Sequence, residues 1–169
     1  LFGFLASNCK KYIGVEPSTK SFQGLQELND TYNKGILFDT FKDVELRNVC
    51  AEDWIPHELV DLVFTSPPYF DCEKYSDEPT QSYLRHPTKE QWTEGFLREL
   101  IAGSHLVLKK NGYLAINIAN TTNHDWIERE FRNLTDEFGF KPIRILNLVL
   151  SSIAGKGIKT EPVFILQKV

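Results

Sequence analysis

Hydrophobic residues in this chain of 169 residues fall into two kinds of segment, separated by short polar breaks. Short runs rich in β-branched and aromatic residues are typical of strands, whereas apolar residues spaced three and four apart indicate helices. The short runs predict strands over 12–15, 46–50, 60–64, 113–118, 143–150 and 161–167. The helical spacing predicts helices over 18–33, 88–108 and 124–138, after a helix end within 1–11. Strands that alternate with helices predict an α/β fold.

Polar residues and glycines mark where these elements begin and end. Ser18 is expected to cap the first full helix, and Thr88 begins a T-x-x-Q capping box for the next. Gly139 is expected to end the third helix, and Asn111 with the glycine after it predicts a turn before the strand at 113. The last two strands are joined by a loop over 151–160, so they pair antiparallel or lie apart.

Composition narrows the class of protein. A hydrophobic share of 41% and a charged share of 25% are ordinary for a globular protein, and we expect one domain over 1–169. The sequence has no long apolar run and no signal-peptide pattern, so we expect a cytoplasmic protein without a membrane partner. The net charge of −4 predicts no broad basic surface. Because Cys9, Cys50 and Cys72 are widely spaced, we expect reduced thiols and no metal site.

The stretch VDLVFTSPPYF, residues 60–70, carries the strongest candidate chemistry. Its apolar part predicts a buried strand, which Pro67 and Pro68 end because they cannot donate backbone hydrogen bonds. Ser66 then lies at the carboxyl end of a strand, where open α/β sheets bind ligands. Its hydroxyl and the Pro67 carbonyl are two acceptors that suit an exocyclic NH2 group, and Tyr69 adds a face for a planar base. A proline-rich strand exit with a packed tyrosine is the simpler alternative.

The segment DLVFTSPPYF resembles the catalytic motif of the amino-group DNA methyltransferases, in which Asp, Asn or Ser precedes Pro-Pro and an aromatic residue. The resemblance implies catalytic roles for Ser66, Pro67, Pro68 and Tyr69, and a substrate contact for Phe70. It implies transfer of a methyl group from S-adenosyl-L-methionine to cytosine N4 or adenine N6 of a base flipped out of DNA. The implied setting is a restriction–modification or phage-type modification system.

Two further strand ends resemble the cofactor-binding motifs of the same family. Glu16, followed by Pro17, ends the first predicted strand, where an acidic residue binds ribose hydroxyls. Asp53, with Glu52 as second choice, follows the next strand, where the family has a carboxylate for the adenine amino group of the cofactor. Trp54 is expected to flank the adenine ring. Solvated carboxylates and a core tryptophan are the alternatives.

The resemblance also implies a fold, a domain boundary and partners. The fold is a Rossmann-like class I methyltransferase sheet with an antiparallel last strand. The family's glycine-rich turn after its first strand has no counterpart here, so we expect Leu1 within the following helix and a domain that lacks strand one and is incomplete at its amino terminus. DNA is the implied partner, with a homo-oligomer or a restriction enzyme as further ones. Two alternatives stay open: an RNA or protein amide methyltransferase, and a non-catalytic subunit that binds nucleic acid.

Overall fold

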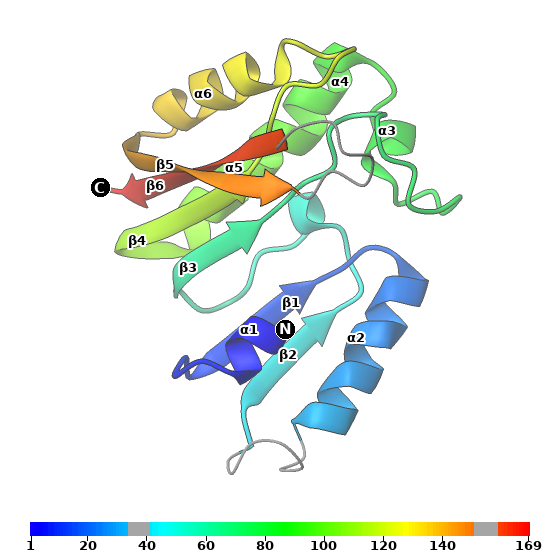
Figure 1. The fold of residues 1–169 in the computed structure, drawn as a ribbon, viewed down its shortest axis with the longest axis vertical. Coiled ribbons are helices and arrows are strands. Elements are labelled where there is room, and N and C mark those ends of the chain that lie inside the picture. The colour runs from blue at the N-terminus through cyan, green and yellow to red at the C-terminus, as the bar shows by residue number, and fades with distance from the viewer. Residues whose placement is uncertain (34–40, 151–158) are drawn as a thin grey trace. The chain divides into compact units, whose positions relative to one another are not determined.

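The structure, a computed structural model, describes residues 1–33, 41–150 and 159–169. The chain divides into a first unit of residues 1–54 and 75–81 and a second unit of residues 55–74 and 82–169. Each unit has a sheet of its own (Figure 1), with two strands in the first and four in the second. The single domain over 1–169 stays a prediction. Among the described residues, no helix is long and apolar enough to cross a membrane.

The first unit is a strand–helix–strand arrangement with parallel strands. Its elements are α1 (Phe2–Leu5), β1 (Lys11–Val15), α2 (Thr19–Tyr32), β2 (Asp43–Arg47) and the short 3-10 helix η1 (Ala51–Asp53). β1 and β2 pair in parallel from Lys11 with Asp43 to Val15 with Arg47. Ser18 caps α2 as predicted, because its hydroxyl accepts a hydrogen bond from the Ser21 N–H at 3.4 Å.

The second unit holds the remaining elements and the larger sheet. They are β3 (Val60–Thr65), α3 (Ser82–Arg85), α4 (Lys89–Trp92), the π-helical turn η2 (Thr93–Leu97), α5 (Arg98–Val107), β4 (Leu108–Asn117), α6 (Ile127–Glu137), β5 (Phe140–Leu150) and β6 (Lys159–Lys168). The strand order is β3-β4-β6-β5, with β3 and β4 parallel and β6 antiparallel to both of its neighbours. The antiparallel last strand is therefore confirmed.

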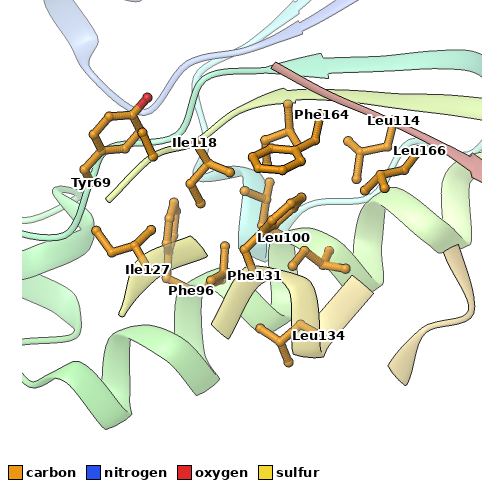
Figure 2. Close-up of a cluster of buried hydrophobic side chains, with 14 of the residues drawn as sticks. Tyr69, Phe96, Leu100, Leu114, Ile118, Ile127, Phe131, Leu134, Phe164 and Leu166 are labelled. Atoms are coloured by element: carbon orange, nitrogen blue, oxygen red, sulfur yellow. The ribbon is translucent and has the colours of Figure 1, made fainter. Parts of the chain in front are cut away.

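Hydrophobic side chains fill the space between one face of this sheet and its helices (Figure 2). Leu114 of β4 and Phe164 of β6 point from the sheet toward Leu100 of α5 and Phe131 of α6. Trp92 and Phe131 are the largest of the fully buried side chains. Tyr69 belongs to the same cluster, so the segment that follows β3 is anchored directly in the core.

β3 is only partly buried, whereas the sequence predicted a buried strand. Val63 packs against the core, but Leu62 is 55% exposed and Phe64 is 74% exposed. The reason is that Leu62 and Phe64 lie on the face of β3 opposite to the hydrophobic cluster, against which Val63 packs. Side chains alternate between the two faces of a strand, so the residues on either side of Val63 point away from the core.

Two sequence predictions of local structure are wrong in detail. The strand predicted over 46–50 is β2, which begins at Asp43, because pairing with β1 overrides the polar character of its first residues. The predicted turn at Asn111 is an irregularity inside β4, where the Asn111 φ angle is 64°. Most of the loop predicted over 151–160 lies outside the described residues.

The irregularity in β4 requires a glycine. A Cβ at Gly112 would lie 2.9 Å from the Lys109 carbonyl oxygen and 3.1 Å from that of Asp61, and neither backbone atom can rotate away. We expect Gly112→Ala to lower the free energy of unfolding by about 1–3 kcal/mol, the usual cost of overpacking. Urea unfolding measures this change.

Gly103→Ala is the matched control, because it adds the same methyl group inside α5. There the new Cβ would meet only Ile55 Cγ1, at 4.0 Å, which is an ordinary contact. This variant should gain about 0.5–1 kcal/mol, as alanine replaces glycine within a helix. Equal stability of the two variants would contradict the steric explanation.

Candidate active site

Ser66 follows the last residue of β3 and is held from the neighbouring strand. Its hydroxyl donates a hydrogen bond to Asn117 Oδ1 at 3.3 Å. Asn117 is the last residue of β4 and is 7% exposed, and its Nδ2 donates to the Pro162 carbonyl of β6 at 2.9 Å. Because Nδ2 faces that carbonyl, Oδ1 faces Ser66. The serine is therefore the donor in this bond and keeps its lone pairs for another donor.

The two prolines of the motif fix the backbone that follows Ser66. Pro67 is buried and Pro68 is half-buried, whereas Ser66 itself is exposed. Proline rings lock φ near −65°, so the segment is stiff. Ser66 is thus an exposed residue next to a stiff segment, and the stiffness is what the two prolines predicted.

Tyr69 is tied to its surroundings through its hydroxyl and its backbone. The hydroxyl donates to Glu161 Oε2 of β6 at 3.2 Å, and the backbone N–H donates to Glu73 Oε2 at 3.4 Å. The Tyr69 carbonyl accepts from the Cys72 N–H at 3.2 Å, which closes a turn. Figure 2 shows the ring at one end of the hydrophobic cluster, and only 8% of the residue is exposed. Stacking of a base on this ring stays a prediction, and it requires the ring to become more accessible.

Phe70, predicted to contact substrate, lies in an aromatic cluster. Its ring meets Trp92, His124 and Trp126 edge to face, with centroid distances of 6.0, 5.2 and 5.9 Å. The residue is 9% exposed, and its φ angle of 57° is uncommon for a residue other than glycine. These contacts make Phe70 an anchor of the motif, and its contact with substrate stays a prediction.

The first two predicted cofactor residues lie where β1 leads into α2. Glu16 Oε1 accepts from the Ser18 N–H at 2.8 Å, and the Glu16 N–H donates to the Arg47 carbonyl at 3.0 Å. The Asn48 side chain donates to the carbonyls of Glu16 and Pro17 at 2.8 and 3.2 Å. These bonds hold Glu16 and Pro17 beside the segment that leaves β2.

The other three predicted cofactor residues lie in and after η1. Glu52 and Asp53 belong to this turn, in which the Asp53 N–H donates to the Cys50 carbonyl at 3.1 Å. Asp53 is exposed, and Trp54 is half-buried with the Arg47 guanidinium 5.8 Å from its ring centroid. Because β1 and β2 are parallel, the residues that follow β1 (Glu16 and Pro17) and those that follow β2 (52–54) lie beyond the same, carboxyl end of the two-stranded sheet.

The Glu16 carboxylate acts on one nearby titratable group, the Tyr12 hydroxyl. Burial, and to a smaller extent the Glu16 carboxylate, raises the pKa of the Tyr12 hydroxyl above its usual range, so this phenol stays neutral. In the second unit, Lys109 lies near the start of β4, where it pairs with Asp61 at 2.9 Å. This lysine is thus at the opposite end of β4 from Asn117 and the motif.

Asn117 and Glu161 lie outside the predicted site and bind the side chains of Ser66 and Tyr69 from later strands. One feature of the sequence, the predicted antiparallel last strand, could have indicated their position. An antiparallel last strand begins beside the carboxyl end of its neighbour, and Asn117 indeed pairs with Val163. Residues at the start of β6 are therefore candidates for contact with a segment that leaves β3.

No family model matches this sequence, and no curated protein matches it either. Solved structures do match its fold. A SAM-dependent methyltransferase from Methanosarcina mazei is 13% identical, with a TM-score of 0.59 over 93% of this chain and 81% of the other. The N-methyltransferase NodS from Bradyrhizobium japonicum WM9 is 12% identical, with a TM-score of 0.64 over 98% of this chain and 77% of the other.

Two further structures extend the comparison. The complex of NodS with S-adenosyl-l-homocysteine is 12% identical and gives a TM-score of 0.64 over 99% of this chain and 71% of the other. A methyltransferase from Pyrococcus furiosus is 14% identical, with a TM-score of 0.57 over 94% of this chain and 62% of the other. At such identities the likeness establishes the fold. The predicted fold class is confirmed: this chain has the α/β, Rossmann-like fold of class I S-adenosylmethionine-dependent methyltransferases.

Proposed function

We propose that this protein is a DNA methyltransferase that transfers a methyl group from S-adenosyl-L-methionine to the exocyclic amino group of cytosine or adenine. One observation carries the proposal. The exposed Ser66 hydroxyl, at the carboxyl end of β3, is oriented by the buried Asn117 and followed by two anchored prolines. The fold supports the choice of methyl donor, because ligands of open α/β sheets bind beyond the carboxyl ends of the strands.

The segment from Ser66 to Tyr69 is proposed to orient the amino group that is methylated. Ser66 donates its own proton to Asn117, so the hydroxyl oxygen accepts one hydrogen of the target NH2. The Pro67 carbonyl accepts the other hydrogen. Two acceptors would orient the amino group so that its nitrogen lone pair faces the methyl donor. Transfer would form the N–C bond as the S–C bond breaks, release S-adenosylhomocysteine and leave the nitrogen to lose one proton. Most of the rate enhancement then comes from orientation.

The residues proposed to hold the cofactor match its hydrogen-bonding groups. Carboxylates only accept, and ribose hydroxyls and the adenine amino group donate, so Glu16 and Asp53 suit these parts of the molecule. Glu52 is a second acceptor in η1, and Pro17 and Trp54 add apolar surface beside the two carboxylates. When bound, the cofactor supplies an electrophilic methyl group on a sulfonium centre.

The position of Ser66 also determines how a base in DNA could reach it. Inside a duplex the amino group of a base is paired and stacked, so the target base must flip out to reach Ser66. Tyr69, held by Glu161, is proposed to support the flipped base once the ring is accessible. DNA is the proposed partner, and a second copy of the chain or a restriction enzyme would complete a modification system.

The test is methyl transfer from labelled S-adenosylmethionine to duplex DNA, with RNA and protein as competing acceptors. We expect label in DNA, found as N4-methylcytosine or N6-methyladenine after digestion to nucleosides. Label in RNA or protein alone would favour an amide or RNA methyltransferase. If calorimetry detects no binding of S-adenosylhomocysteine, the chain is better described as a non-catalytic subunit.

A further inference from the structure

Three side chains with metal-binding chemistry meet in the second unit, next to the proposed catalytic motif. Asp71 and Cys72 directly follow Phe70, and His124 lies in the loop between β4 and α6. A carboxylate oxygen, a sulfur and a ring nitrogen of these residues all lie within 4.8 Å of one another. His124 Nε2 is 2.6 Å from Asp71 Oδ1, so the two loops already touch.

We propose that Asp71, Cys72 and His124 form a binding site for a divalent transition-metal ion, with Zn²⁺ as the preferred ion. A thiolate and an imidazole are the ligands of borderline-soft cations, whereas Mg²⁺ and Ca²⁺ take oxygen ligands. Three protein ligands leave the fourth position of a tetrahedral zinc ion to water. The exposed position of Asp71 and Cys72 leaves room for that water.

The histidine side of the site is rigid without an ion. Residues 121–124 form a tight turn closed by two backbone hydrogen bonds, Thr121 N–H to His124 O at 3.0 Å and His124 N–H to Thr121 O at 3.2 Å. The His124 ring packs edge to face against Phe70 and Trp126 at 5.2 and 5.7 Å, and its side chain is 15% exposed. Little conformational freedom is therefore lost when this ligand binds a metal.

The position of Cys72 is also fixed by the backbone, and the Thr121 hydroxyl lies beside its sulfur. The turn from the Tyr69 carbonyl to the Cys72 N–H, at 3.2 Å, positions the thiol. Cys72 Sγ lies 3.3 Å from Thr121 Oγ1, which can donate to a thiolate and so support the ligand from outside. Asp71 is 52% exposed in its side chain and is free to withdraw from His124 to admit an ion.

A bound ion would clamp the loop after β3 to the loop after β4, just downstream of Tyr69. The wide spacing of the cysteines predicted no metal site. Asp71 and His124 are 53 positions apart, and only the fold brings them together. The proposal rests on these contacts and does not depend on methyl transfer.

Titration of the purified protein with Zn²⁺ by calorimetry, and with Co²⁺ by absorption spectroscopy, tests this proposal. We expect one ion per chain and a thiolate-to-cobalt charge-transfer band. Cys72→Ser and His124→Ala should each weaken Zn²⁺ binding by ~100-fold or more, the upper end of the cost of losing even a supporting residue. Cys9→Ser is the matched control, because Cys9 is also exposed but lies in the first unit.

If His124→Ala fails to fold, variants of the two exposed ligands, Asp71 and Cys72, still test the proposal. Cys72→Ser and Asp71→Asn change only exposed side chains, so circular dichroism should show the wild-type fold for both. Stoichiometric Zn²⁺ binding that survives in both variants would overturn the proposal. Failure of the wild-type protein to bind either ion would also overturn it.

Discussion

Replacing Ser66 by alanine should slow methyl transfer to DNA by about 10²–10³-fold, the usual cost of losing one oriented hydrogen-bonding group at a reacting centre. The hydroxyl is exposed, and its own proton is used by Asn117. Its loss therefore removes an acceptor for the target amino group without opening a cavity. Single-turnover transfer from labelled S-adenosylmethionine measures the rate of the chemical step.

The affinity for S-adenosylhomocysteine should not change in this variant, because the residues proposed to hold the cofactor lie elsewhere in the chain. Ser104→Ala is a matched control: its hydroxyl donates to the Leu100 carbonyl at 2.7 Å within α5, so the rate should stay at the wild-type level. A Ser66→Ala protein with full turnover would remove the proposed role of Ser66. Equal losses in both serine variants would point to a general effect on folding.

Local signals predicted much of the fold. Ser18 and Thr88 cap helices as expected, and each accepts from the backbone N–H three residues on. Gly139 ends α6 with a φ angle of 76°, a conformation that favours glycine. These features depend on a few consecutive residues, so the sequence alone determines them.

Features that depend on distant residues were missed or misplaced. β2 begins with the charged Asp43, and only its pairing with Lys11 of β1 makes this end a strand. The turn expected at Asn111 lies within β4 because β3 pairs with this strand both before it, at Leu108, and after it, from Tyr113 onward. Strand limits set by a partner strand cannot be found from the pattern of one segment.

The candidate site likewise has features that the sequence predicted and features that it did not. The motif's position at a strand end was predictable, because two prolines stop any strand. The burial of Tyr69 and Phe70 was not, since an aromatic residue after a proline is equally suited to stack on a base or to enter the core. The partners of the motif, Asn117 and Glu161, come from strands much later in the chain. The antiparallel last strand points to the start of β6 as a place to search, but the contacts themselves are seen only in the tertiary structure.

Trp92→Ala should destabilise the protein by about 3–5 kcal/mol, the usual cost of removing a large buried aromatic side chain. Trp92 is 0% exposed, and its ring lies 5.2 Å from that of Phe96 and 6.0 Å from that of Phe70. Its Nε1–H donates to the Ser82 hydroxyl at 3.3 Å. The substitution therefore leaves a cavity and removes a support of the motif. Urea unfolding monitored by circular dichroism measures the loss.

Two control variants separate packing from hydrogen bonding. Ser82→Ala removes only the acceptor of the indole N–H, so it should cost about 1–3 kcal/mol, the penalty for an unsatisfied buried donor. Leu106→Ala removes a side chain that is 59% exposed on α5 and should change stability by less than ~0.5 kcal/mol. If Trp92→Ala and Leu106→Ala lose equal stability, Trp92 does not anchor the core. A large loss confined to Trp92→Ala would show that the packing around Trp92, which includes Phe70 of the motif, stabilises the fold.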